Sequence, residues 1–233
     1  MSVQNVQTIV PTHLPGTSGL WPVGTKVRYR IGSLPANRPA INLSTMSQIM
    51  SDAFNAWKSS GHLPIDFVEV TAEPCEIVVN WERFAGIGLD GILARTDYPP
   101  AAGTSPNVIA FNDDPAISWA ASSVNGFDYD LRYIALHEVG HAIGLAHSTS
   151  HEVVMSDSIG LGPGFGLQFA DITAAGLLYA HRVKNALAGR LLQLLGVRAG
   201  ARRVLCGSVA AGAAALALQA APQRLVGGQA GSR

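Results

Sequence analysis

The sequence is poor in cysteine, and its first 20 residues lack both a basic start and a long apolar run. Two cysteines, Cys75 and Cys206, do not make the framework of a small disulfide-rich domain. One bridge between them stays open, although we expect two unrelated thiols. The opening stretch is polar and rich in proline and glycine, so we expect an extended lead-in over residues 1–20 and no secretory signal. Export by another route, or a start further upstream, also stays open.

Acidic residues are absent from the C-terminal part of the chain. Residues 182–233 hold seven Arg, one Lys and no acid, a net charge of +8. Because the whole chain has 16 basic and 16 acidic residues, residues 1–181 carry 8 basic and 16 acidic groups, a net charge of −8. This asymmetry predicts an acidic folded domain over residues 21–181 and a basic, Ala/Gly/Leu-rich tail over residues 182–233. We expect a monomer that binds no nucleic acid.

The tail itself has two patterns. Leucines at helical spacing predict a helix after residue 182, and residues 204–221 form an uncharged run of 18 residues, just below the ~20 that span a bilayer. One interpretation is a membrane-surface helix followed by a weak anchor, with contact over residues 182–221. The other is a mobile or partly helical extension. Arginines flank the uncharged run on the side of the folded domain and would keep that domain in the cytoplasm, so we do not assign an anchor.

Short β-rich runs and helical patterns alternate through the first 181 residues. Strands are expected at residues 27–31, 65–70, 76–81, 91–94 and 107–111. A first helix is expected to begin after an N-cap at Ser44 and to end at Gly61. Two more are expected over residues 130–144 and 169–179. This order predicts an α/β (α+β) fold with a mixed sheet.

Three histidines lie within the stretch HEVGHAIGLAHS. His137 and His141 are four residues apart, so they share one helical face and can hold one ion through imidazole nitrogens. His147 lies six residues further on, roughly 240° round a helix, and reaches the same ion only if the helix ends first. Gly144 supplies that end, because glycine adopts the left-handed conformation most cheaply. The spacing predicts a three-histidine zinc site with a fourth position for water, as in catalytic zinc sites.

Glu138 follows the first of these histidines and is offset from it by about 100° on a helix. It therefore borders the metal without ligating it, where a general base for water is needed. The alternative is that the helical histidines only occupy a solvated face, since HExxH also occurs by chance. His151, four residues after His147, is the one rival for third ligand. Gly140, in the middle of the helix, costs about 1 kcal/mol relative to Ala and indicates close packing there.

HExxHxxGxxH is the zinc signature of the metzincin metallopeptidases, and the stretch resembles their matrixin, or matrix-metalloproteinase-like, branch. Ser148 after the third histidine and Met155, eight residues past it, match the matrixin pattern, in which a Met-turn lies beneath the ligands. The similarity extends in matching order from about Trp21 to Tyr179, through WPVGTKVRYRI, SDAFNAWKSSGHLPIDFVEV, GILART and FADITAAGLLYA. It implies a metzincin-type catalytic domain with a twisted, mixed five-stranded sheet and three helices.

The resemblance implies a zinc-dependent endopeptidase that hydrolyses peptide bonds of proteins. The three histidines would hold one catalytic zinc, and Glu138 would be the general base for a zinc-activated water and then protonate the leaving amine. Substrate would lie antiparallel along the GILA edge strand, with the main chain of Leu93 and Ala94 as binding partners. Asp171 is expected to brace the Met-turn. The family also implies protein or peptide substrates and an extracellular or cell-surface location.

Several positions depart from the matrixin pattern. In the matrixin pattern, residues of the loop before the edge strand and of the next two strands hold a structural zinc. Here that loop, ERFAGIGLD, has no histidine, and the positions in the two strands are occupied by Arg95 and Ala110. We therefore expect no structural zinc. The carboxylates that bind calcium in relatives are reduced after the fifth strand, so Asp113 and Asp114 could bind calcium but a solvated turn is expected. No cysteine precedes the first strand, so cysteine-switch latency is not encoded.

Two other functions compete with the peptidase. The first is a catalytically idle peptide-binding module of the same fold, which the retained Glu138 argues against because an inactive relative could lose the base and keep the metal. The second is a zinc hydrolase with a non-peptide substrate, which the strand-like substrate edge argues against.

Overall fold

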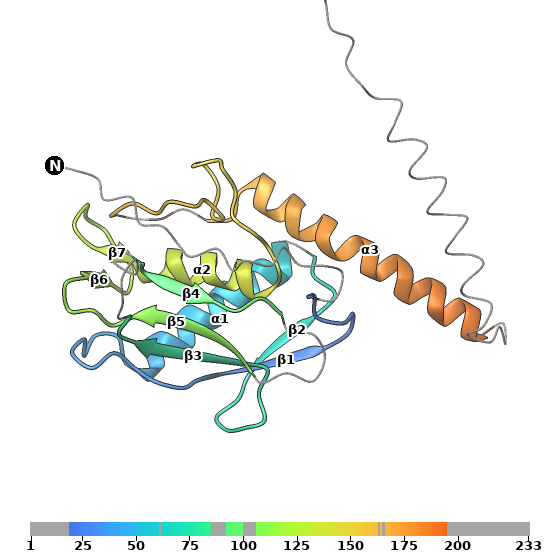
Figure 1. The fold of residues 1–233 in the computed structure, drawn as a ribbon, viewed down its shortest axis with the longest axis horizontal. Helices are drawn as coiled ribbons and strands as arrows, with labels where there is room; N and C mark the ends of the chain where they lie inside the picture. The colour runs from blue at the N-terminus through green and yellow to red at the C-terminus, as the bar shows by residue number, and fades with distance from the viewer. Residues whose placement is uncertain are drawn as a thin grey trace, which may run out of the picture. The chain divides into compact units, whose positions relative to one another are not determined.

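The computed structural model describes residues 19–60, 62–84, 92–99, 106–162, 164 and 166–194. Five strands form one sheet in the order β2-β1-β3-β5-β4 (Figure 1). These strands are β1 (Lys26–Ile31), β2 (Asp66–Glu69), β3 (Ile77–Glu82), β4 (Ala94–Thr96) and β5 (Asn107–Asn112). The first four in spatial order run parallel, and β4 pairs antiparallel with β5 at the edge of the sheet. The expected mixed five-stranded sheet is confirmed.

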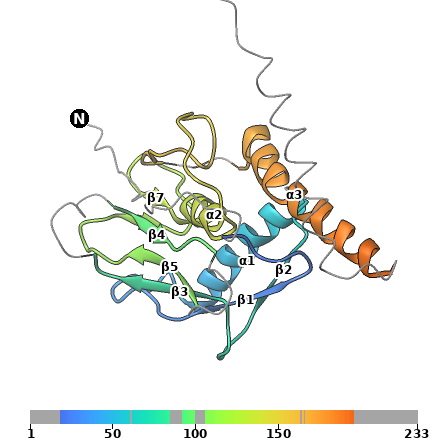
Figure 2. The ribbon, with the colours of Figure 1, turned by 45° about the vertical axis from the view of Figure 1, so that its right-hand side comes forward.

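Helices α1 (Leu43–Ser60) and α2 (Leu131–Ala142) pack against each other and cover the same face of the sheet (Figures 1 and 2). The buried face of α1 follows helical spacing and consists of Met46, Ile49, Met50, Ala53, Phe54 and Trp57. The indole Nε1 of Trp57 donates to the Leu136 carbonyl at 2.7 Å, and that of Trp21 donates to the Ala142 carbonyl at 2.8 Å. Burial of the apolar face therefore holds α1 in place, while two indole hydrogen bonds fix the position of α2.

Two short strands, β6 (Trp119–Ala120) and β7 (Tyr129–Asp130), pair in parallel just before α2. Their length of two residues each is too short for a sequence pattern, and the prediction missed them. Asp130 ends β7 and caps α2, because its side chain accepts hydrogen bonds from the backbone N–H groups of Arg132 and Tyr133. The small sheet thus delivers the chain directly to the start of the helix that carries the histidines.

Three predicted boundaries are wrong. Asn42, not Ser44, caps α1, since its Oδ1 accepts from the Thr45 N–H at 3.0 Å. The edge strand lies at Ala94–Thr96 instead of residues 91–94, because the Asn112 side chain binds the Ile92 carbonyl at 2.8 Å and regular pairing begins only at Ala94. Gly91 lies outside the described residues.

The third wrong boundary concerns α3, which runs from Phe169 to Leu194 instead of ending near Tyr179. No Gly or Pro follows Tyr179 at once, so the expected third helix and the helix expected in the tail form one element. The chain divides into two compact units, Met1–Lys184 and Asn185–Arg233. The boundary near residue 181 stays a prediction.

None of the helices in the described part of the chain is both long and apolar enough to cross a bilayer. The uncharged run of residues 204–221 lies outside the described residues, as does Cys206. Cys75 is a buried free thiol.

Candidate metal centre

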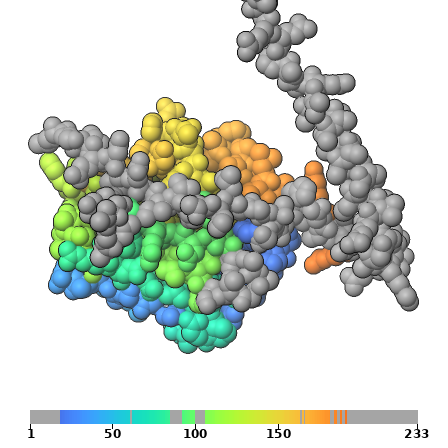
Figure 3. Space-filling model, in the orientation of Figure 1, coloured from blue at the N-terminus to red at the C-terminus, as the bar shows by residue number. Residues whose placement is uncertain are grey.

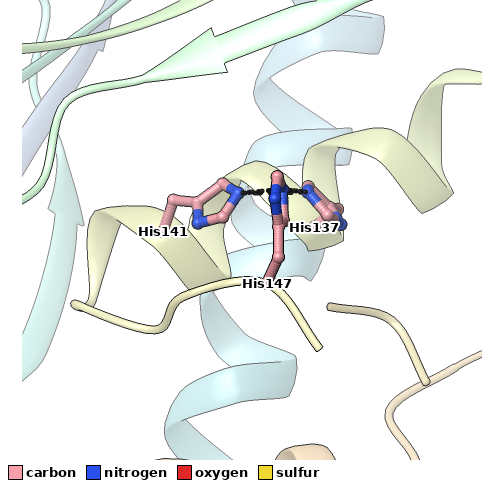
Figure 4. A group of neighbouring side chains, drawn as sticks. All are labelled: His137, His141 and His147. Carbon is pink, nitrogen blue, oxygen red and sulfur yellow. Dashed lines mark hydrogen bonds between the residues drawn. The ribbon is translucent and has the colours of Figure 1, made fainter. Parts of the chain in front are cut away.

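The three histidines of HEVGHAIGLAHS meet at one point (Figure 4). The Nε2 atom of His137 lies 3.1 Å from that of His141 and 3.2 Å from that of His147, and the last two lie 3.0 Å apart. His137 and His141 are almost fully buried, and His147 closes the group from the surface side. Within the described residues, this is the one cluster of three or more side chains able to hold a metal ion.

A glycine turn brings the third histidine to the other two. Helix α2 ends at Ala142, and Gly144 follows with a φ of +106°. The N–H groups of Gly144 and Leu145 donate back to the carbonyls of His141 and Gly140 at 2.8 and 2.9 Å. These bonds close the helix and reverse the chain, as expected for a left-handed C-terminal cap. His147 therefore approaches from beyond the helix end, and the bend expected at Gly144 is present.

Hydrogen bonds to the main chain orient the first two imidazoles. The Nδ1 of His137 lies 2.7 Å from the Val154 carbonyl, and that of His141 lies 2.8 Å from the Leu145 carbonyl. Each carbonyl requires a proton on Nδ1, so Nε2 keeps a free lone pair for a metal. The Nδ1 of His147 is buried and has no partner among the described residues.

Burial keeps these imidazoles neutral. It lowers the pKa of His137 to about 4, lowers the pKa of His141 well below its ordinary value, and lowers the pKa of His147. Neutral imidazole is the form that binds metals. Two nitrogens at zinc-bond distance around a tetrahedral ion are about 3.4 Å apart, so the observed triangle fits zinc after a small expansion.

His151 is not part of this group. It is exposed, and its Nδ1 lies 3.0 Å from the hydroxyl of Ser158 and 3.4 Å from that of Ser156. Its four-residue spacing from His147 does not bring it to the other histidines because the chain around it turns instead of continuing as a helix.

Glu138 is fully buried next to the histidines. Its Oε2 accepts a hydrogen bond from the hydroxyl of Thr96 at 2.7 Å, while its Oε1 is buried without a partner in the described structure. Burial raises the pKa of Glu138 to about 8, against the smaller opposite effect of the Thr96 hydrogen bond. Sequence reasoning missed Thr96. Alternation in β4 puts Thr96 on the same buried face as Ala94, but the strand predicted from the sequence ended at residue 94, and only the fold brings this face to Glu138.

Met155 and Asp171 lie on the other side of the ligands. The backbone N–H groups of Val154 and Met155 donate to the Asp171 carboxylate at 3.0 and 3.2 Å. Figure 3 shows the segment after residue 150 (yellow) beside the start of α3 (orange) on the surface. A Cβ added at Gly140 would lie only 2.2 Å from the Met155 sulfur. The mid-helix glycine therefore lets Met155 pack directly against α2.

Leu93 and Ala94, the predicted substrate partners, differ in their surroundings. The Leu93 carbonyl accepts the Asn112 N–H at 2.8 Å, so it is engaged within the sheet. Ala94 pairs with Phe111, and since alternate residues of an edge strand direct their main chain outward, its N–H and carbonyl face the open edge of β4. The side chains of both residues are buried, so only main-chain groups can meet a ligand there.

The acidic turn after β5 is occupied by an arginine. The Arg38 guanidinium pairs with the Asp113 carboxylate and donates to the carbonyls of Asp114 and Ile117 at 2.8 and 3.1 Å. Arg83 lies 3.5 Å from the Asp114 carboxylate. The turn expected to be solvated thus has cationic partners from the chain itself. Arg95, which stands where the family pattern has a structural-zinc ligand, forms an ion pair with Glu82.

Comparison with known proteins places this geometry in a family. The matrixin peptidase family model matches residues 20–180. Bovine (Bos taurus) interstitial collagenase is 30% identical over 161 residues, which cover 66% of this chain and 31% of the relative. Human (Homo sapiens) matrix metalloproteinase-17 is 29% identical over 178 residues, covering 73% of this chain and 26% of the relative. Matrilysin of Felis catus is 30% identical over 169 residues, covering 68% and 60%.

The chain spans between about a quarter and three fifths of the length of these relatives. The similarity covers the sheet, the three histidines and the start of α3. Since the family model matches more than half of the sequence, the chain belongs to the matrixin family.

Proposed function

We propose that this chain is a zinc-dependent endopeptidase that hydrolyses peptide bonds of proteins. The observation that carries the proposal is the convergence of three neutral imidazoles, two of them buried and the third half-buried, whose Nε2 atoms lie within 3.2 Å of one another, together with the buried carboxylate of the adjacent Glu138. A closed structural site would use a fourth protein ligand, and none of the described residues supplies one. His137, His141 and His147 are the proposed ligands of one catalytic zinc ion.

The reaction divides between the metal and the chain. Zinc held by the three histidines supplies Lewis acidity, which activates water and polarises the scissile carbonyl. Glu138 accepts the proton of the attacking water and later delivers it to the leaving amine. Its place supports this role, because Glu138 is adjacent to His137 on α2 and its Oε1 has no hydrogen-bond partner among the described residues.

The substrate is proposed to lie as an extended strand along the open edge of β4. The main-chain groups of Ala94 support this position because they face the open edge. Ala94 also lies in the same short strand as Thr96, whose hydroxyl contacts Glu138. Leu93 is the second proposed binding residue, and since its carbonyl already accepts the Asn112 N–H, Ala94 is the main-chain partner that the geometry favours.

Met155 and Asp171 are proposed to support the ligands from below. Asp171 accepts hydrogen bonds from the two N–H groups of the turn, and the Val154 carbonyl in the same turn orients His137. A shift of the turn would therefore reach the first ligand. Supporting groups of this kind commonly change metal affinity by roughly 10–100-fold when removed.

The wider setting rests on the family. We propose protein or peptide substrates, a single catalytic domain over residues 21–181 and an extracellular or cell-surface location. We also propose that the domain binds no structural zinc, because Arg95 stands where relatives carry a zinc ligand, and that the Arg38–Asp113 ion pair weakens calcium binding at the acidic turn. A membrane contact by residues 182–221 and a monomeric state stay predictions.

Zinc analysis combined with a digest tests the proposal. The zinc content of the wild type and of Glu138→Ala is measured first, and both are then incubated with denatured proteins whose new termini are identified by mass spectrometry. We expect about one zinc per chain in both, cleavage by the wild type and a loss of at least 100-fold in Glu138→Ala. Glu152→Ala, which removes an exposed glutamate, is the matched control. Equal cleavage by Glu138→Ala, or none by zinc-loaded wild type, would reject the assignment.

A further inference from the structure

The carboxylate of Glu138 has two oxygens in different environments. Oε2 accepts a hydrogen bond of 2.7 Å from the Thr96 hydroxyl, and both side chains are buried, with Thr96 6% and Glu138 0% exposed. Oε1 is buried and has no hydrogen-bond partner among the described residues. A buried acceptor without a partner is costly and uncommon, so the unequal pair of oxygens requires an explanation.

The donor comes from the strand at the edge of the sheet. Thr96 is the last residue of β4 and pairs with Ile109 of β5, so the sheet fixes its main chain. Its side chain points to the same buried face as that of Ala94, toward α2, and β4 and α2 are in contact. A threonine has one hydroxyl donor and stiff χ1 preferences, so it presents this donor in a narrow range of directions.

We propose that Thr96 is a positioning residue for Glu138: its hydroxyl holds Oε2 and thereby assigns Oε1 as the oxygen that exchanges protons with the reacting water and the leaving amine. This inference rests on the proposed peptidase function. Because Oε2 is already engaged, rotation of the carboxylate about its last bond would break the Thr96 hydrogen bond between two buried side chains. The general base is therefore held in one orientation before a substrate arrives, which is the condition for efficient proton transfer.

The same contact connects substrate binding with the base. Ala94 and Thr96 belong to one three-residue strand, and the proposed substrate pairs with the outward main-chain groups of that strand. A substrate that pairs with β4 thus docks on the element that orients Glu138. Loss of the hydroxyl should consequently reduce the rate of the chemical step without weakening the main-chain pairing that binds substrate.

The first experiment compares steady-state kinetics of zinc-loaded wild type, Thr96→Val and Thr96→Ser on a fluorogenic peptide chosen from the digest. Valine has the shape of threonine without the hydroxyl, and serine restores the hydroxyl. We expect kcat to fall roughly 10- to 100-fold in Thr96→Val, the rate equivalent of one hydrogen bond to a charged group, with KM within about twofold of the wild type. Thr96→Ser should recover most of kcat, and all three proteins should hold the same amount of zinc.

A second experiment measures the contact without activity or metal. Urea unfolding midpoints of the zinc-free chain are compared for Thr96→Val in the wild-type background and in Glu138→Met, where the acceptor is replaced by an apolar side chain of similar length. We expect the midpoint to fall when Glu138 is present and to stay unchanged or rise in Glu138→Met, because the hydroxyl then has no acceptor.

The outcomes separate the two proposals. Wild-type kcat in Thr96→Val, equal loss in Thr96→Ser and Thr96→Val, or a fall in zinc content that accounts for the lost rate would overturn the positioning role. Equal midpoint changes in both backgrounds would show that the hydrogen bond does not form and would overturn it independently. Absence of cleavage by zinc-loaded wild type defeats the peptidase function and the role of Thr96 in it, while the urea midpoints still report on the hydrogen bond alone.

Discussion

Gly140→Ala tests whether the helix that carries the histidines and the turn beneath it are packed without spare room. The added Cβ would lie 2.2 Å from the Met155 sulfur and 3.0 Å from Trp57 Cζ2. Since non-bonded heavy atoms prefer separations of roughly 3.5–4.0 Å, the sulfur must move by more than about 1 Å. Met155 is only 3% exposed, and its sulfur can move only away from α2, toward the cavity of about 240 Å³ that it lines with Asp171.

Two opposing effects determine the stability of this variant. Overpacking of a core costs about 1–3 kcal/mol, whereas replacing a mid-helix glycine by alanine gains about 1 kcal/mol. We therefore expect Gly140→Ala to lower the free energy of unfolding of the zinc-free protein by about 1 kcal/mol. In a Met155→Ala background the sulfur is gone and only the 3.0 Å approach to Trp57 Cζ2 remains, so the same change should raise the free energy of unfolding by up to about 1 kcal/mol. The coupling between the two sites is thus up to about 2 kcal/mol.

The assay is urea unfolding of the four proteins of this cycle, followed by competition for zinc with a chromogenic chelator. Displacement of Met155 moves the turn whose Val154 carbonyl orients His137, so zinc affinity should fall about tenfold in Gly140→Ala. Gly160→Ala is the control, because an added Cβ there meets nothing within 4 Å. A stabilisation by Gly140→Ala in both backgrounds would refute the packing argument.

Four more outcomes follow from the site and its surroundings. Asp171→Ala leaves the N–H groups of Val154 and Met155 without their acceptor, and urea unfolding should show a loss of about 1–3 kcal/mol. Gly144→Ala combines a φ of +106° with a Cβ 2.5 Å from Leu20 Cδ2, so it should lower the melting temperature more than Gly24→Ala, where φ is +79° and the space is open. Removal of zinc by a chelator should lower the melting temperature. If the free zinc concentration was 100 times its Kd, the lost stabilisation is about 2.7 kcal/mol. Added calcium should not restore the melting temperature. Arg38→Gln leaves Asp113 without its cationic partner, so the melting temperature should fall and should become responsive to millimolar calcium, in contrast to the wild type.

The local pattern of the sequence was enough to predict that the three histidines come together. The four-residue spacing of His137 and His141, the glycine at position 144 and the adjacent Glu138 are each defined by neighbours within eleven residues. Helix geometry and the left-handed preference of glycine act over the same short range. The three Nε2 atoms consequently converge where the spacing predicted, and the five-stranded sheet also follows the order of the sequence patterns.

Contacts between distant segments decided what the sequence could not. Thr96 reaches Glu138 across 42 residues, Asp171 reaches Val154 across 17, and Arg38 reaches the acidic turn across 75. The start of the edge strand and the cap of α1 also depend on single side chains, those of Asn112 and Asn42. In the sequence these two asparagines cannot be distinguished from asparagines in ordinary loops. Hydrogen bonds of this kind depend on which surfaces the folded chain brings together, and no periodicity along the sequence records that. The sequence by itself determined which three histidines converge, and the tertiary structure alone determined how they and Glu138 are held.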